Sequence, residues 1–229
     1  MDKYKISFYV LMLLMIFLIG FKLCVNLKNE DKNEIKSNLE DVQIGNYIIK
    51  KNNNFSYHNT SERNKKIEYI VIHYTGAETS ALSYVEFFNN PLSTDASADY
   101  FVDYNGDIYQ YNLDIDNRYS WAVGGDNENS LGGSLYGIVN NENSISIELC
   151  VRSNGAKDAN MYGWSFNSVT LEASIELVKY LMEKYGISID NVIRHYDVNG
   201  KLCPGIIGWN EDSGSVNEWE KFKTMISLQ

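Results

Sequence analysis

The sequence is poor in cysteine and proline, and it carries no excess of positive charge. Three scattered cysteines among 229 residues are too few for the disulfide framework of a small secreted domain. Two prolines, and no segment rich in Pro, Gly or Ser, exclude a disordered body. A net charge of −10 argues against nucleic-acid binding, which needs a basic surface. With 44% apolar and 13% aromatic residues, the chain is expected to fold as one main domain and to be a monomer.

Residues 1–25 differ in composition from the rest of the chain. An uncharged run covers Ile6–Phe21, and beyond Lys22 it extends to Val25, which makes a stretch of 20 residues. At about 1.5 Å per residue this stretch spans roughly 30 Å, the thickness of the hydrocarbon core of a bilayer. No small-residue cleavage site follows it, so an uncleaved transmembrane helix is favoured over a cleaved signal peptide. The rest of the chain is then expected on the extracytoplasmic face of the membrane, or secreted if the segment is cleaved.

Residues 26–45 alternate Lys, Asn, Glu and Asp and contain few apolar residues, which is typical of a solvated tether. Six lysines and six acidic residues balance within residues 1–45, so the whole net charge falls on residues 46–229. The expected organisation is therefore a membrane segment at 1–25, a charged tether at 26–45 and a folded acidic domain at 46–229.

Strand and helix patterns alternate along residues 46–229. Short apolar runs rich in β-branched residues predict strands, and apolar residues at helical spacing with capping residues predict helices. The strands are expected at Tyr69–Tyr74, Tyr100–Asp103, Ile108–Tyr111, Ser120–Val123, Ser144–Val151 and Asn191–His195, and the helices at Ser80–Phe88, Val169–Tyr185 and Val216–Ile226. This order indicates an α/β fold, a single domain with a central mixed β-sheet flanked by helices.

Two of the three histidines lie at or near the carboxyl ends of predicted strands. His73 stands in VIHYTG and His195 in VIRHYD, and this edge of an α/β sheet commonly binds ligands. Cys203 follows His195 by eight residues, and the turn dipeptide Asn199-Gly200 between them allows the chain to double back. Two imidazoles and a thiolate suit Zn²⁺ and leave a fourth position for water. From spacing alone, satisfied polar histidines and a buried loop cysteine remain the alternative.

Five segments carry a resemblance to a known family. In order they are YIVIHYTGA, SADYFVDYNGDIYQ, YSWAVGG, NENSISIELC and VIRHYDVNGKLCPGIIGWN. They resemble the successive motifs of the second family of zinc-dependent N-acetylmuramoyl-L-alanine amidases. That family includes phage and prophage endolysins and is related in fold to the peptidoglycan recognition proteins. The resemblance runs from about residue 45 to the carboxyl terminus, and the last segment is its most specific part.

The resemblance implies a function and a role for five residues. It implies a peptidoglycan hydrolase that cleaves the amide bond between N-acetylmuramic acid and L-alanine by means of zinc-activated water. His73, His195 and Cys203 are implied as zinc ligands, Glu148 as the general base and Lys201 as an electrostatic stabiliser. The local sequence supports a place for Glu148 beside the metal, since a carboxylate in the apolar strand SISIELCV is costly to bury unless a cation compensates it.

Several positions depart from the family motifs or stay open. Asp99 and Ala122 stand where relatives often have histidine, which leaves substrate contacts and stem-peptide specificity undefined, and Ser146 replaces a frequent glycine. Asp197 is expected either to support a ligand imidazole or to form a turn.

Three aromatic residues, Trp121, Tyr136 and Trp164, are candidates for stacking on sugar, with core packing as the favoured interpretation of each. Cys150 is expected in the core and His58 on the surface.

Two other functional classes are compatible with parts of the pattern. A non-catalytic peptidoglycan-binding module of the same fold is the main alternative, and the presence of Cys203 argues against it. A cysteine peptidase that uses Cys203 and His195 would leave His73 without a role.

Overall fold

The computed structural model describes residues 40–55, 59–93, 96–124, 133–210 and 217–228. The described chain folds as one unit that begins at Asp41. No helix within those ranges has the length and apolar character needed to cross a membrane. The predicted membrane segment at 1–25, most of the predicted tether and His58 lie outside the described residues.

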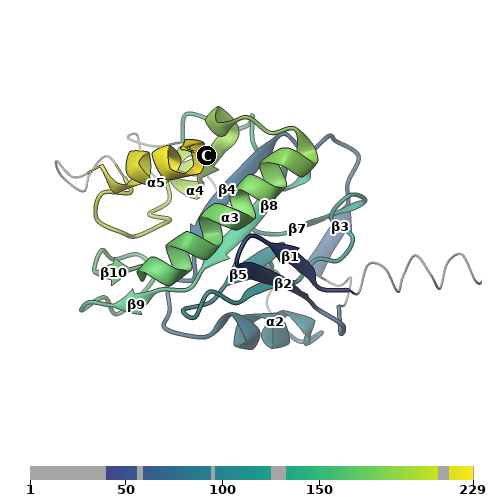
Figure 1. Cartoon of the computed structure of the whole chain (residues 1–229), viewed down its shortest axis with the longest axis horizontal. Helices are drawn as coiled ribbons and strands as arrows, with labels where there is room; N and C mark the ends of the chain where they lie inside the picture. Colours follow the sequence, from purple (N-terminus) through teal and green to yellow (C-terminus); the bar gives the residue numbers. More distant parts are fainter. Residues whose placement is uncertain (1–39, 56–58, 94–95, 125–132, 211–216, 229) are drawn as a thin grey trace, which may run out of the picture. The chain divides into compact units, whose positions relative to one another are not determined.

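A seven-stranded mixed sheet forms the centre of the domain, in the order β1-β2-β6-β5-β8-β4-β11 (Figure 1). Parallel pairing joins β5 to β8, β8 to β4, β4 to β11 and β2 to β6, and antiparallel pairing joins β1 to β2 and β5 to β6. The strands are β1 Val42–Ile44, β2 Tyr47–Lys51, β4 Tyr69–Tyr74, β5 Tyr100–Val102, β6 Ile108–Gln110, β8 Ser144–Leu149 and β11 Val192–Arg194. The predicted α/β fold with a central mixed sheet is thus confirmed.

Helix α3, Ser168–Tyr185, crosses one face of the sheet (Figure 1). The Asn167 side chain caps its first turn by accepting from the Thr170 backbone, and Gly186 ends it in the left-handed conformation at φ 66°. Its apolar face packs on Ile145, Ile147 and other residues of the main core, together with α5, Glu218–Ser227. The long helix predicted at Val169–Tyr185 is therefore present and begins one residue earlier.

The opposite face of the sheet is covered in part by α2, Ala81–Asn89, which packs on Phe101 of β5. Successive strand residues point to opposite faces. Because Ile70 and Ile72 face the core under α3, the residues between and after them, Val71 and His73, face the other side. In β8, Ile145 and Ile147 likewise face the core under α3, so Ser146 and Glu148 face the opposite side of the sheet.

Two small ribbons and several short elements complete the fold. They are the ribbon of β3 Thr60–Glu62 with β7 Arg118–Ser120, the ribbon of β9 Arg152–Ser153 with β10 Trp164–Ser165, the 3-10 turns η2 Asn141–Asn143 and η3 Ile189–Asn191, and the short helix α4 His195–Asn199.

Several predicted boundaries differ from the structure, and three of them concern the start of the domain or the residues of the site. The tether was expected to reach residue 45, but Val42–Ile44 form β1 and pair with β2. A strand was expected over Ser120–Val123, whereas β7 ends at Ser120, because β3 offers it only three partners. The strand expected to include His195 ends at Arg194, since the backbone turns into α4 there.

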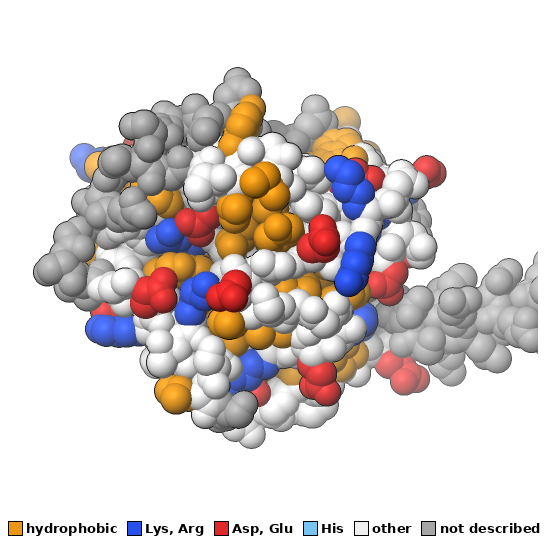
Figure 2. Space-filling model, turned by 90° about the horizontal axis from the view of Figure 1, so that it is seen from above, with side chains coloured by type: hydrophobic (Ala, Val, Ile, Leu, Met, Phe, Trp, Pro, Cys, Tyr) orange, Lys and Arg blue, Asp and Glu red, His pale blue; other side chains and the backbone are white. Residues whose placement is uncertain are grey.

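Charged side chains of both signs are mixed on the surface. On the face seen in Figure 2, lysines and arginines are interspersed with aspartates and glutamates around apolar patches. Among the described residues on that face, positive charge is not gathered into one continuous area, which agrees with the acidic balance of the sequence.

Candidate metal centre and active site

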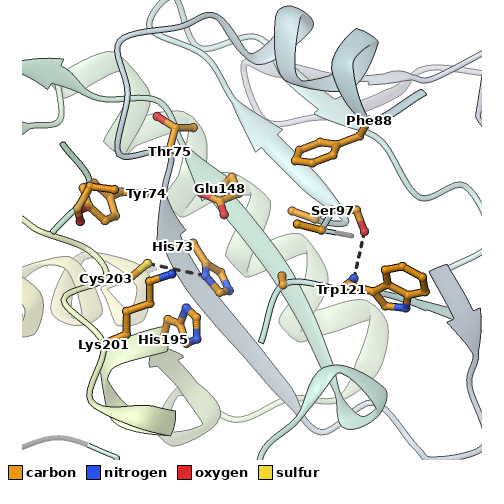
Figure 3. Close-up of a pocket in the computed structure, with 14 residues that line it drawn as sticks. His73, Tyr74, Thr75, Phe88, Ser97, Trp121, Glu148, His195, Lys201 and Cys203 are labelled. Carbon is orange, nitrogen blue, oxygen red and sulfur yellow. Dashed lines mark hydrogen bonds between the residues drawn. The ribbon is translucent and has the colours of Figure 1, made fainter. Parts of the chain in front are cut away.

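The three predicted metal ligands meet at one edge of the sheet (Figure 3). His73 is on β4, and His195 directly follows β11, which pairs in parallel with β4 at Arg194 and Ile72. Ligand atoms of His73, His195 and Cys203 all lie within 4.8 Å of one another. Their exposed fractions are 2%, 4% and 4%, so water reaches none of them freely.

The return of the chain to His195 depends on the end of α4. Gly200 takes the left-handed conformation at φ 81°, and the Asn199 side chain accepts a hydrogen bond from the Lys201 backbone at 3.0 Å. The Tyr196 backbone N–H then donates to the Cys203 carbonyl at 3.0 Å. These bonds bring Cys203 beside the first turn of α4, as the Asn199-Gly200 dipeptide predicted.

The geometry of the ligand atoms fits zinc. Cys203 Sγ lies 3.7 Å from His73 Nδ1. Tetrahedral zinc with Zn–S and Zn–N bonds of roughly 2.3 and 2.05 Å requires a separation of about 3.6 Å. In addition, the Nε2 atom of His195 is buried without a hydrogen-bond partner among the described residues. Such an atom is costly to leave unpaired, and coordination of a metal would account for its burial.

Electrostatics keep both imidazoles neutral. Burial, the neighbouring His195 and the charge of Lys201 hold the pKa of His73 well below its ordinary value. Burial, followed by Lys201, lowers the pKa of His195 to about 4, against a weaker opposing effect of a hydrogen bond with the Gly124 backbone. Neutral imidazole is the form that binds a metal, so these side chains are ready to coordinate near neutral pH.

Glu148 lies beside His73. The two residues are directly paired across β8 and β4, and both face the side of the sheet away from α3. The Oε2 atom of Glu148 is buried and has no hydrogen-bond partner among the described residues. Burial raises the pKa of this carboxyl to about 8, and the nearby charge of Lys201 acts in the opposite direction. With this pKa the carboxyl carries a proton at neutral pH as long as no metal is bound beside it, and the positive charge of a bound metal would favour the ionised form that can accept a proton.

All five predicted site residues line a single cavity of about 220 Å³. In Figure 3, His73, His195, Lys201 and Cys203 lie on one side and Phe88, Ser97 and Trp121 on the other, with Glu148 between them. The structure therefore assembles the set that motif spacing predicted, and it adds an opposite wall.

Most of that wall was not predicted. Apart from Trp121 and Ala122, its residues gave no chemical signal in the sequence, because small and apolar side chains more often serve the core. They are Phe88, Ala96, Ser97 and Ala98, and Tyr74, Thr75 and Ala159 line the cavity near the ligands. Ala122, where relatives often have histidine, thus contributes to the wall. Trp121 faces the cavity, and its indole N–H donates to Ser61 Oγ at 2.9 Å.

The other two aromatic candidates lie elsewhere. Trp164 is 6% exposed and belongs to the core, where its ring packs against Tyr74. Tyr136 is 49% exposed and is not among the residues that line the cavity.

Asp99 lies behind the wall and is 1% exposed. Its carboxylate accepts from Asn112 Nδ2 at 2.9 Å, Ser120 Oγ at 2.8 Å and the Ser146 backbone at 2.9 Å. These bonds connect Asp99, which follows Ser97 by two residues, to Ser120 just before Trp121 and to Ser146 two residues before Glu148. Its role is structural, so a substrate contact at this position is excluded by burial.

Asp197 also has a structural role. It forms an ion pair with Arg194 at 2.5 Å and accepts from the Arg194 backbone at 2.8 Å. It therefore caps α4 at the residue next to His195, a local role that is closer to the turn-forming expectation for Asp197 than to support of a ligand imidazole.

The fold and the site define the class of the protein as an endolysin-like amidase domain. A solved mutant endolysin from Bacillus subtilis matches with a TM-score of 0.51 and 27% identity, over 74% of this chain and 91% of the endolysin chain. A family model described as N-acetylmuramoyl-L-alanine amidase matches residues 63–206.

Two curated relatives agree with this class. The N-acetylmuramoyl-L-alanine amidase CwlL of Bacillus licheniformis is 31% identical over 157 residues, which cover 66% of this chain and 39% of the relative. The amidase CwlA of Bacillus subtilis (strain 168) is 30% identical over 164 residues, covering 72% and 50%. The chain belongs to the N-acetylmuramoyl-L-alanine amidase family. It spans half or less of the length of these two relatives.

Proposed function

We propose that this chain is a zinc-dependent N-acetylmuramoyl-L-alanine amidase that hydrolyses the bond between N-acetylmuramic acid and L-alanine in bacterial peptidoglycan. The observation that carries the proposal is the convergence of two neutral imidazoles, a thiol and an unpartnered carboxyl on one cavity, in a chain of this family. Peptidoglycan is the substrate class that the family membership supports.

The residues divide the work of an amide hydrolysis. His73, His195 and Cys203 would hold zinc, which when bound supplies Lewis-acid activation of water and of the amide carbonyl. Glu148 accepts the proton of the attacking water and later donates it to the departing amine of alanine. Lys201 places a positive charge at the same cavity, where it stabilises the negative charge that develops on the carbonyl oxygen.

Product analysis tests this proposal. The purified full chain, incubated with bacterial peptidoglycan, should release stem peptides with a new free alanine amine and produce no new sugar reducing ends. Treatment with a chelator should abolish the release, and added zinc should restore it. New reducing ends would identify a glycosidase instead. Activity that survives the chelator would favour a cysteine peptidase, and binding without cleavage would favour a recognition module.

We also propose that residues 1–25 anchor the domain to the bacterial membrane, so that it works on the extracytoplasmic face. The uncharged run Ile6–Phe21 supports this. Cell fractionation should find the full chain in the membrane fraction and a chain that lacks residues 2–25 in the soluble fraction. Recovery of the protein from the medium without its first 20 or more residues would instead mean a cleaved signal peptide.

A further inference from the structure

The wall that faces the metal ligands is formed by a segment without strand pairing. Strand β7 ends at Ser120, and Trp121 and Ala122, which line the cavity, come directly after it. Backbone N–H groups in such a segment still need acceptors, because leaving them unpaired away from bulk water is costly. The question is therefore which groups hold this wall in place.

Side chains supply the acceptors for three successive N–H groups. The Trp121 N–H donates to Ser97 Oγ at 3.0 Å. The N–H groups of Ala122 and Val123 both donate to one atom, Asn141 Oδ1, at 3.0 and 2.5 Å. A single amide oxygen thus accepts hydrogen bonds from two successive backbone N–H groups, a role that a neighbouring strand has inside a sheet.

The backbone of Asn141 is in turn held in place by other residues. It begins the turn η2, and the buried Arg63 donates to the carbonyl oxygens of Asn141, at 3.4 Å, and of Glu142. On the other side of the wall, Val123 packs in an apolar cluster with Val71 of β4 and Ile193 of β11. These residues lie two positions before His73 and His195, so the wall and the metal ligands rest on the same two strands.

We infer that Asn141 is a positioning residue for substrate binding, because its side-chain oxygen holds residues 121–123 in the place where they form the cavity wall. This inference rests on the proposed amidase function. Asn141 is not among the residues that line the cavity, so it acts through Trp121 and Ala122 and not on the scissile bond.

Two substitutions separate positioning from general stability. Asn141→Ala removes the shared acceptor, whereas Asn141→Asp keeps an oxygen of the same reach. With the zinc-loaded full chain and a soluble muropeptide, Asn141→Ala should raise KM about tenfold, which corresponds to 1.4 kcal/mol. It should leave kcat within about twofold of the unsubstituted chain. Asn141→Asp should restore KM.

Asn117→Ala is the matched control, because that exposed side chain donates to Asp114 at 2.8 Å and lies outside the cavity lining. It should leave both kinetic constants unchanged. If Asn141→Ala does not fold, Asn141→Ser carries the same test, since its hydroxyl is too short to reach both N–H groups.

Three results would overturn the inference. They are an unchanged KM in Asn141→Ala, a parallel loss of kcat and zinc, and a failure of Asn141→Asp to restore KM. If the unsubstituted chain cleaves nothing, the amidase proposal fails, and binding of the same muropeptide measured by calorimetry then decides the role of Asn141. In that case the dissociation constant should rise about tenfold in Asn141→Ala, and an equal constant would contradict the positioning role.

Discussion

Replacing Glu148 with glutamine removes the proton acceptor of the site and keeps its shape. The Oε2 atom makes no hydrogen bond among the described residues, so no structural bond is lost. A positioned general base typically contributes 10² to 10⁴ in rate. At 1.36 kcal/mol for each factor of ten, Glu148→Gln should raise the activation barrier by about 3–5 kcal/mol.

The other properties of the Glu148→Gln protein should stay close to those of the unsubstituted chain. The three ligands are untouched, so one zinc per chain should remain. The melting temperature should change little, because glutamine has the same shape and the Oε2 atom makes no hydrogen bond among the described residues that the substitution would break. The loss should therefore appear in kcat, with KM nearly constant.

The assay is the initial rate of amine release from purified peptidoglycan, with zinc content and melting temperature measured on the same sample. Glu218→Gln is the matched control, since Glu218 pairs with Lys221 at 2.7 Å on the surface and is not among the cavity residues. A zinc-loaded Glu148→Gln protein that retains more than about a tenth of the original kcat would refute the assignment of Glu148 as general base.

Three further predictions concern charge, metal and pH. Lys201→Ala should lower kcat by about 10² to 10³, as removal of an oxyanion-stabilising group does, while Lys65→Ala should not; equal rates for the two would contradict the role of Lys201. Removal of zinc by a chelator should lower the melting temperature, because a ligand that binds only the folded state stabilises it; an unchanged melting temperature would argue against a bound metal. Burial, followed by repulsion from Lys184, lowers the pKa of Lys51 to about 8 from 10.5. Between pH 8 and 10.5 the unfolded chain therefore binds more protons, so stability should rise with pH across this window. Lys51→Met should lack this rise, as denaturant titrations at pH 7 and 10 can show, and an equal rise in the two chains would contradict its assignment to Lys51.

The parts of the fold with strong local patterns were predictable from the sequence. The buried strand Tyr69–Tyr74 has the predicted bounds, and the strands expected at Tyr100–Asp103 and Ile108–Tyr111 are present as the antiparallel pair β5 and β6, each one residue shorter. Helix α3 differs from its prediction by one residue, because a long apolar face, an Asn cap and a Gly stop all agree. The short strands were missed, since Val42–Ile44 has only three residues within a polar stretch and depends on pairing with β2.

The site was predictable where chemistry and spacing coincide. Two histidines at strand ends and a cysteine after an Asn-Gly turn pointed to a metal centre, and the structure brings the three together. The wall at Trp121 and the role of Asn141 were not predictable, because they depend on hydrogen bonds between segments about 20 residues apart. The role of Asp99 was left open by the sequence, and only the structure places its carboxylate in a buried network.

The zinc-to-protein ratio of the purified full chain, measured beside the ratios of Cys203→Ala and Cys150→Ala, tests the three-ligand metal centre most directly. Both cysteines are buried, but only Cys203 lies with the two histidines. The metal centre predicts one zinc per chain in the unsubstituted and Cys150→Ala proteins and a large loss in Cys203→Ala. An unsubstituted chain without zinc, or a Cys203→Ala chain that keeps a full equivalent, would contradict it.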